Sequence, residues 1–210
     1  MKNKAITKEL QENMTPQGVL ADLMEGNNRF ANGDMQTIDH NALVQQTTSG
    51  QFPKAVILSC IDSRVPVEVV FDQAIGDVFV ARVAGNFENT DILGSMEYSC
   101  KVAGSRLILV MGHESCGAVK AACDEVELGN ITAMLDNIMP AVRKASEEVE
   151  GEMNSANRAF VDRTIENNVH LTIDRIRKKS PILKEMEDNG EIAMIGAVYK
   201  LSSGRVQVLT

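Results

Sequence analysis

Two short apolar runs, at residues 55–58 and 107–111, each lead directly into residues that bind metal ions. Each run has the length of a buried strand. The first is followed by Cys60 and the second by His113 and Cys116. Thiolate and imidazole are good zinc ligands, and three of them in a tetrahedral array leave the fourth position free for water or substrate. Since a free position is typical of catalytic zinc, these residues predict a catalytic metal centre.

Strand and helix signals alternate along the chain, which is typical of an α/β fold with a central, mostly parallel β-sheet flanked by helices. Strands are expected at residues 55–60, 78–83, 106–111, 192–199 and 205–209. The first two are expected to be buried, and the last two to form a C-terminal hairpin. Helices are expected at residues 16–33, 65–71, 91–102, 117–126 and 156–179.

Several residues mark where these helices begin and end. Thr15 is expected to cap the first helix, with a proline directly after it and Gly33 near the other end. Asp91 is expected to cap the third helix. Pro140 interrupts the helical spacing of apolar residues between 131 and 142, so it should kink or break a helix there.

The length and composition of the chain indicate a single domain. With 210 residues, of which 44% are apolar, the chain can bury a substantial core. No internal repeat indicates a second unit. Within the one domain, residues 1–50 are expected to form an N-terminal helical arm that ends in a polar stretch, and residues 51–210 a catalytic α/β core.

Charge and hydropathy exclude two classes of partner. The 29 acidic and 21 basic residues give a net charge of −8, which argues against nucleic acid. No run of about 18 apolar residues is present to span a membrane, and the N-terminal residues lack the apolar stretch of a signal peptide. We therefore expect a cytoplasmic protein. A removed leader and a periplasmic location stay open.

The cysteines are better explained by metal binding than by disulfides. The four of them could form two bridges, but a cytosolic location and the grouping of Cys60 and Cys116 with histidine and aspartate favour a metal. Cys100 and Cys123 lie in predicted helices with no ligand partner nearby. We expect both to be ordinary buried residues.

The two metal-binding segments are expected to meet at one edge of the sheet. Open α/β sheets bind ligands beyond the carboxyl ends of their strands, and Cys60 and His113 each fall at such an end. Cys116, three residues after His113, can reach the same ion from a turn that leads into a helix. Cys60 and Asp62 point the same way if the chain between them is extended. All four groups converge if the two strands are neighbours.

Three motifs of this chain resemble those of the β-class carbonic anhydrases. They are Cys-x-Asp-x-Arg at residues 60–64, Arg-Val-Ala-Gly-Asn at residues 82–86 and His-x-x-Cys-Gly at residues 113–117. The likeness runs from Leu23 to Ala118 and, more loosely, to the C-terminal hairpin. It implies a zinc lyase, a carbonate dehydratase, that interconverts carbon dioxide with bicarbonate and a proton.

The same resemblance implies roles for individual residues. One zinc ion per subunit would be held by Cys60, His113 and Cys116. Asp62 and Arg64 would form a catalytic pair beside the metal. The resemblance further implies a homodimer or a dimer of dimers, in which the N-terminal helix wraps the partner subunit and the active site lies at the interface.

Three further residues are expected to bind substrate by this comparison. Gln51 stands nine residues before the first ligand cysteine, where plant-like members of the family carry a glutamine. Phe79 and Tyr98 match the family's apolar pocket and its hydrogen-bonding tyrosine. By residue type alone, Phe79 and Tyr98 are expected to be core residues of an α/β fold, and a pocket role needs structure to establish it.

The expected chemistry follows from zinc. The ion lowers the pKa of a bound water toward about 7, so a zinc-bound hydroxide is the expected nucleophile toward carbon dioxide. Two thiolates cancel the charge of the ion, so its bound water should be a weaker acid than the water at a three-histidine site. Activity should therefore rise toward mildly alkaline pH. Asp62 can accept a hydrogen bond and aim the hydroxide at carbon, while Arg64 keeps Asp62 ionised. His40 and His170 are expected to be exposed, and neither is placed near the zinc, so no proton shuttle is assigned.

Alternatives stay open at this point. Asp62 could be the permanent fourth ligand of a closed structural or redox zinc site, although Arg64 argues against this arrangement. In a subset of the family the corresponding aspartate does bind zinc at low pH, in a form stabilised by bicarbonate at a separate site. The Gln51 match predicts the open form here. Hydrolysis of a related heterocumulene such as carbon disulfide is a further alternative, which depends on access to the pocket.

Overall fold

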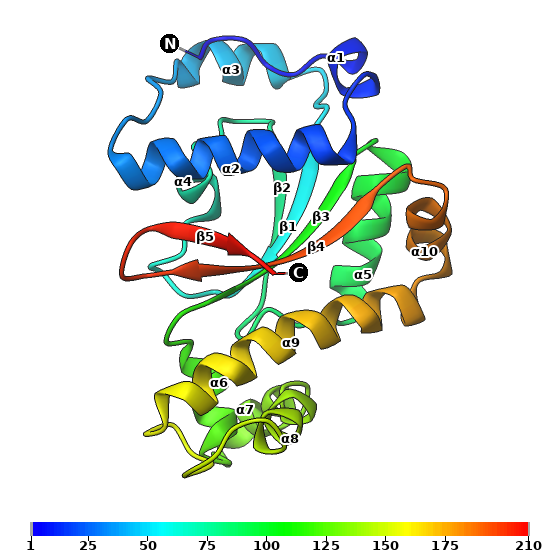
Figure 1. Ribbon diagram of the computed structural model, residues 1–210. Coiled ribbons are helices and arrows are strands. Elements are labelled where there is room, and N and C mark those ends of the chain that lie inside the picture. The colour runs from blue at the N-terminus through cyan, green and yellow to red at the C-terminus, as the bar shows by residue number, and fades with distance from the viewer. Residues whose placement is uncertain (1, 210) are drawn as a thin grey trace.

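The computed structural model, which describes residues 2–209, is built around one five-stranded sheet (Figure 1). Its strands are β1 (Ala55–Ser59), β2 (Val78–Arg82), β3 (Leu107–His113), β4 (Ala193–Lys200) and β5 (Arg205–Val208). Their order across the sheet is β2-β1-β3-β4-β5. The first four are parallel, and β5 pairs antiparallel with β4. The predicted α/β fold and its closing hairpin are confirmed.

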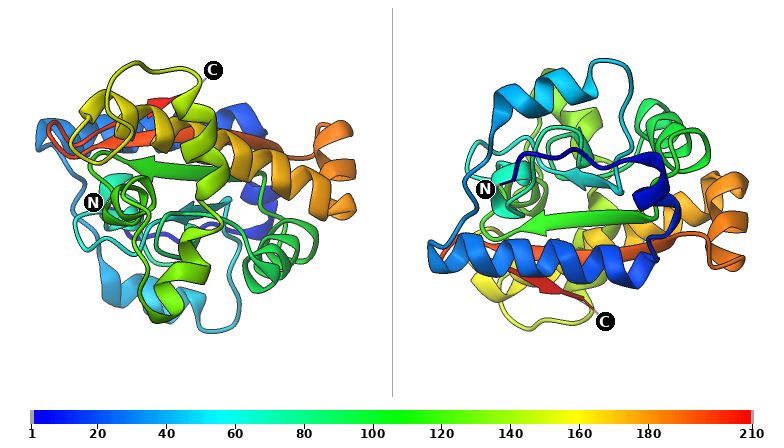
Figure 2. Two further views of the ribbon diagram at one scale, coloured as in Figure 1. Left: turned by 90° about the horizontal axis from the view of Figure 1, so that it is seen from below. Right: turned by 90° about the horizontal axis from the view of Figure 1, so that it is seen from above.

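Helices cover both faces of this sheet (Figures 1 and 2). Before the third strand lie α1 (Lys8–Glu12), α2 (Pro16–Asn32), α3 (His40–Thr47), α4 (Val67–Val70), α5 (Thr90–Glu97) and the π-helical segment η1 (Tyr98–Val102). After it lie α6 (Gly117–Cys123), α7 (Gly129–Leu135), α8 (Met139–Ser146), α9 (Arg158–Lys179) and α10 (Pro181–Asp188). None of the helices within residues 2–209 is long and apolar enough to cross a membrane.

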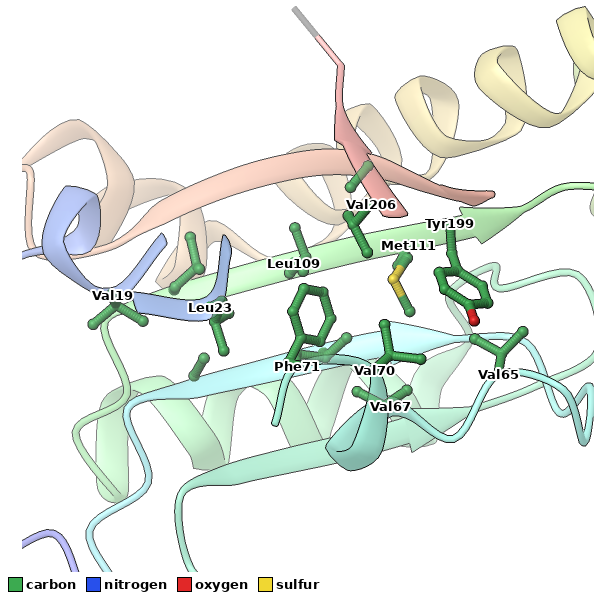
Figure 3. Close-up of a cluster of buried hydrophobic side chains, with 14 residues drawn as sticks. Val19, Leu23, Val65, Val67, Val70, Phe71, Leu109, Met111, Tyr199 and Val206 are labelled. Carbon is green, nitrogen blue, oxygen red and sulfur yellow. The ribbon is translucent and has the colours of Figure 1, made fainter. Parts of the chain in front are cut away.

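The two central strands explain why their sequences are apolar without alternation. Every residue of β1 and β3 is buried, because helices pack on both sides of them. Ile57 and Leu109 face a cluster that includes Leu23 of α2 and Phe71 (Figure 3). Their neighbours, such as Leu58, face the opposite cluster, which is covered by α5, α9 and α10. Because β1 and β3 are also neighbouring parallel strands, their carboxyl ends lie side by side.

The helix signals read from the sequence are largely confirmed. The Thr15 hydroxyl accepts a hydrogen bond from the backbone N–H of Gly18 at 3.1 Å, and α2 ends at Gly33, whose φ is +77°. Pro140 breaks the helical pattern as expected, and lies in the first turn of α8. The N-cap of α9 is Asn157, which lies within the predicted range of that helix.

Other expectations about the elements are wrong. Asn89, not Asp91, caps α5, since its side chain accepts from the Ile92 N–H at 2.9 Å. The predicted helix 91–102 changes at Tyr98 into a π-helical turn. β2 is not buried: it is the edge strand, its first four residues are half-buried and Arg82 is exposed. Helices α3 and α10 were not expected from the sequence.

The N-terminal arm packs on the sheet of its own chain. Val19 and Leu23 of α2 are buried in the cluster that also holds β1 and β3 residues. Asn27 of α2 donates to the backbone carbonyl of Gly204 in the hairpin turn at 2.8 Å, and accepts from the Val206 N–H at 2.8 Å. Helix α2 is therefore part of the fold that supports the site. Whether it also wraps a partner subunit stays a prediction.

Candidate metal centre

Three buried side chains converge at the carboxyl edge of the sheet. Cys60 directly follows β1, and His113 is the last residue of the neighbouring parallel strand β3. The Sγ atoms of Cys60 and Cys116 lie 3.9 Å apart, and one ligand atom from each of the three residues falls within 4.8 Å of the others. No other such group of possible metal ligands occurs among residues 2–209. The expected convergence is confirmed.

A sharp turn lets His113 and Cys116 approach the same point. Ser115, between them, has a φ of +56°, a left-handed conformation that few residues other than glycine adopt. The turn delivers Cys116 to the N-cap position of α6. Behind the two residues, α6 to α9 form a third apolar cluster, which keeps water away from the sulfur atoms.

His113 presents one ring nitrogen to the centre. Its Nδ1 donates to the backbone carbonyl of Glu114 at 3.0 Å, which leaves the lone pair on Nε2. The imidazole is fully buried, and Nε2 has no hydrogen-bond partner in the structure. A buried, unpaired nitrogen costs free energy unless something binds it. A metal ion bound at this position would give Nε2 a partner.

The two thiols have opposite acidities. The hydrogen bond from Cys116, with help from His113 and the Gly85 N–H, lowers the pKa of the Cys60 thiol to about 4. The same contact and burial raise the pKa of the Cys116 thiol. A divalent cation bound between the two sulfurs would favour the thiolate form of both. Two thiolates and one imidazole nitrogen in a small buried space match the donors and geometry of zinc.

Asp62 and Arg64 form an ion pair beside these ligands. Arg64 Nε donates to Asp62 Oδ1 at 2.9 Å and Nη2 donates to Oδ2 at 2.7 Å, while the Arg64 backbone N–H also donates to Oδ1. These bonds hold the pKa of the Asp62 carboxyl well below its usual range. Oδ2 lies 3.8 Å from His113 Nε2. The carboxylate is therefore next to the metal centre, ionised and held by Arg64.

Arg82 and Gly85 also contact the site, and no separate role was expected for either residue. Arg82 Nε donates to the carbonyl of Cys60 at 2.9 Å and its Nη2 to the carbonyl of Asp62 at 2.7 Å. The Gly85 N–H donates to Cys60 Sγ at 3.4 Å. The Arg-Val-Ala-Gly-Asn motif could have suggested such roles, since it resembles a family segment and follows the neighbouring strand.

Gln51, Phe79 and Tyr98 lie together but away from these ligands. All three line one cavity of about 550 Å³, in which the Phe79 and Tyr98 rings meet edge to face with centroids 6.3 Å apart. Phe79 pairs in register with Val56, four residues before Cys60, so this cavity lies roughly 13 Å along the strand from the metal centre. Within one chain they do not line the same pocket as the zinc ligands.

The remaining cysteines and histidines are only partly as expected. Cys100 and Cys123 are free and buried, and burial raises the pKa of the Cys100 thiol to about 12. His40 is exposed as predicted, but His170 in α9 is half-buried. Tyr98 is 56% exposed in the single chain, so the expectation of a core position is wrong for it, whereas Phe79 packs partly buried against the sheet.

The fold and the site define an α/β protein with a buried Cys-His-Cys cluster that could hold a zinc ion and an adjacent Asp–Arg ion pair. The carbonic anhydrase family model matches residues 55–206. Carbonic anhydrase 2 of Mycobacterium tuberculosis is 36% identical over 202 residues, which cover 92% of each chain. The chain belongs to the β-class carbonic anhydrase family.

Solved structures agree with this assignment. The Coccomyxa β-carbonic anhydrase in complex with acetazolamide matches with a TM-score of 0.72 and 27% identity, over 90% of this chain and 86% of that one. A chain from the crystal structures of two tetrameric β-carbonic anhydrases of Sordaria macrospora shares the fold, with a TM-score of 0.69 and 22% identity over 90% of this chain and 96% of that one. The chain is thus a zinc-dependent carbonic anhydrase, which hydrates carbon dioxide reversibly to bicarbonate and a proton.

Proposed function

We propose that this hydration takes place at the Cys60–His113–Cys116 centre with Asp62 and Arg64 as its catalytic pair. One observation carries the proposal. An ionised carboxylate stands 3.8 Å from the unpaired His113 Nε2, yet it is bound on its other side by a two-pronged contact to Arg64. A carboxylate held in this way remains available as a hydrogen-bond acceptor and would leave the fourth position of a bound ion open.

The protein residues would divide the work as follows. Zinc, when bound, acts as a Lewis acid that makes water a nucleophile near neutral pH. Asp62 accepts a hydrogen bond from the attacking water, so that a lone pair points at the carbon of carbon dioxide. Arg64 keeps Asp62 ionised and turned toward the reacting water. Arg82, through the Cys60 and Asp62 carbonyls, fixes the backbone that carries both residues.

We further propose a dimer as the working unit, in which the cavity holding Gln51, Phe79 and Tyr98 faces the metal centre of the partner subunit. The edge strand β2 leaves backbone groups unpaired, and unprotected edges favour pairing with a second chain. A groove of about 960 Å³ runs along β2 and α5 from Phe79 to Val83. Exposed apolar side chains lie beside it, Tyr98 and Val102 among them. A tetramer would then be a dimer of dimers.

The expected cytoplasmic location is kept as a proposal. A cytoplasmic location follows only from the composition and the N-terminal sequence. The closed structural or redox site is disfavoured by the Asp62–Arg64 contact. Hydrolysis of carbon disulfide can be distinguished from hydration of carbon dioxide only by comparing the rates on the two substrates.

The decisive experiment is stopped-flow hydration of carbon dioxide on protein with measured zinc, across pH, with a carbon disulfide arm in parallel. Wild type should hydrate carbon dioxide, with the rate rising toward mildly alkaline pH. Cys60→Ser should lose zinc and activity together, and Asp62→Asn should keep zinc but lose rate. Equal hydration rates in wild type and Cys60→Ser would refute the proposal, as would turnover of carbon disulfide alone.

A further inference from the structure

A tight turn after β2 brings a backbone N–H to one of the zinc-ligand sulfurs. Val83 donates from its backbone N–H to the Ser59 carbonyl at 3.1 Å, and the Asn86 N–H returns to the Val83 carbonyl at 3.0 Å. Gly85, inside the turn, has a φ of +83°. This conformation directs its N–H to Cys60 Sγ at 3.4 Å. The placement of one peptide group therefore decides whether the sulfur receives a hydrogen bond.

Asn168 on α9 holds this turn from across the core. Its Nδ2 donates to the Gly85 carbonyl at 2.7 Å, a contact between residues 83 positions apart. The side chain is 1% exposed. Packing supports the same glycine, since a Cβ at Gly85 would lie 2.4 Å from Ile138 Cδ1. Gly85 is thus fixed by one hydrogen bond and by close packing.

The hydrogen bonding of Asn168 is directed at one group. Its Oδ1 is buried and has no hydrogen-bond partner in the structure. Leaving this acceptor unpaired carries a desolvation penalty, which offsets much of what the single good hydrogen bond contributes. An apolar side chain would avoid that penalty but would leave the Gly85 carbonyl without its Asn168 donor. The contribution of Asn168 therefore lies in holding the Gly85 carbonyl.

We propose that Asn168 is a positioning residue for the metal centre, which acts by holding the Gly85 carbonyl and so keeps the backbone of Gly85 in the conformation whose N–H donates to the Cys60 thiolate. The inference rests on the proposed function, because it concerns the zinc-loaded protein. A hydrogen bond to a metal-bound thiolate draws electron density from the sulfur, so less charge reaches the ion. With two thiolates already neutralising the zinc, each such bond makes the ion a stronger Lewis acid. Asn168 thereby tunes the metal without touching it.

The chain supplies a matched control one residue away. Asn167 is equally buried, at 1% exposure, and lies on the same helix. Its Nδ2 donates to Glu148 Oε2 at 2.8 Å, on a path that does not reach the ligands. Asn167→Leu and Asn168→Leu remove the same chemical group from the same helix. Only the second should alter the metal centre.

The test uses cobalt(II)-substituted and zinc-loaded protein. In Asn168→Leu, and in a second variant Asn168→Ala, the thiolate-to-cobalt charge-transfer band should move to lower energy, because the sulfur regains the electron density that the hydrogen bond withdrew. Zinc release to a chelator should be about tenfold faster, because the loosened turn no longer holds Cys60 in position. Asn167→Leu should match wild type in both measurements, whatever its effect on melting temperature. An unshifted band in folded Asn168 variants, or the same shift in Asn167→Leu, overturns the inference.

A wild-type measurement decides the matter if the Asn168 variants fail to fold. In protein loaded with an NMR-active cadmium isotope, the Gly85 amide proton should show scalar coupling to the metal through the sulfur, and absence of that coupling overturns the inference. Failure of the proposed function would look different. Wild-type protein would then bind no stoichiometric zinc or cobalt, or would bind zinc without hydrating carbon dioxide.

Discussion

The guanidinium of Arg64 donates two hydrogen bonds to the carboxylate of Asp62, with Nε 2.9 Å from Oδ1 and Nη2 2.7 Å from Oδ2. A planar fork of this kind fixes both the position and the orientation of a carboxylate, which a point charge cannot do. Because Asp62 Oδ2 also stands 3.8 Å from His113 Nε2, the fork sets how the carboxylate faces the metal centre. The first predictions follow from this pair.

Replacing the Arg64 guanidinium by a lysine ammonium should lower the hydration rate and leave the zinc content unchanged. In Arg64→Lys the charge remains but the two-pronged contact is lost, so Asp62 samples other orientations. We expect kcat/KM for carbon dioxide hydration to fall about 100-fold at unchanged zinc content. Arg158→Lys is the control, since Arg158 is an exposed arginine that pairs with Glu114 at 2.7 Å. A rate in Arg64→Lys within twofold of wild type would contradict the orienting role.

The same variant should change the acid side of the pH profile. Arg64 holds the pKa of Asp62 well below its usual range, so in wild type Asp62 stays ionised at any pH where the enzyme works. A depressed pKa contributes stability above the unfolded value of about 3.9, and that contribution is lost as pH falls below it. In Arg64→Lys the pKa of Asp62 should rise, so activity should begin to fall at a higher pH than in wild type. Rate–pH profiles, with zinc measured at each pH, test this; coincident acid limbs would argue against it.

Metal removal should expose one reactive thiol before the others. In the zinc-loaded protein Cys60 and Cys116 are ligands, and burial raises the pKa of the Cys100 thiol to about 12 and also that of Cys123. Iodoacetamide at about pH 8 should therefore label none of the four. After chelation Cys60 should react first, because its pKa is lowered to about 4. Peptide mapping by mass spectrometry reads the order. Early labelling of Cys100 would contradict it, and denatured protein, in which all four react, is the control.

The convergence of Cys60, His113 and Cys116 was predictable from the sequence because each lies within a few residues of a recognisable strand. Residues 55–58 and 107–111 are apolar without alternation, which marks strands buried on both faces, and such strands end at the ligand-binding edge of the sheet. Asp62 and Arg64 follow Cys60 so closely that their positions come with it. Local order along the chain was sufficient for these residues.

What the sequence could not provide depends on distant segments. The contact between Asn168 and Gly85 joins α9 to the turn after β2, and no periodicity in either segment predicts this contact. The exposure of Tyr98 depends on β2 being an edge strand, which is a property of strand order. The error at Asp91 was local: acidic residues are favoured both as N-caps and in the first turn, and here Asn89 takes the cap while Asp91 lies in the turn.

The Gly85 turn should tolerate no side chain. Gly85→Ala meets two costs, the strain of a positive φ and a clash of its Cβ with Ile138 Cδ1 at 2.4 Å. Gly33→Ala meets only the first, since its φ is +77° but nothing lies within 4 Å of a Cβ there. We expect Gly33→Ala to lower the free energy of unfolding by about 1 kcal/mol and Gly85→Ala by roughly 1–3 kcal/mol more. Urea unfolding of chelated samples measures both. Equal losses in the free energy of unfolding of the two variants would mean that the Ile138 side chain can move aside at no cost in stability.

A charged side chain introduced into the apolar surface beside β2 should both dissociate the subunits and lower the hydration rate. Val102 is 70% exposed and lines the cavity that holds Gln51 and Tyr98, so in the proposed dimer it is buried against the partner. Val102→Glu should therefore shift the sedimentation of the protein toward monomer and lower the hydration rate, because a buried unpaired charge is costly and the partner's cavity is lost. Leu128→Glu, at a position 63% exposed beside α7, should change neither. A monomeric Val102→Glu with full activity would show that one chain suffices for catalysis.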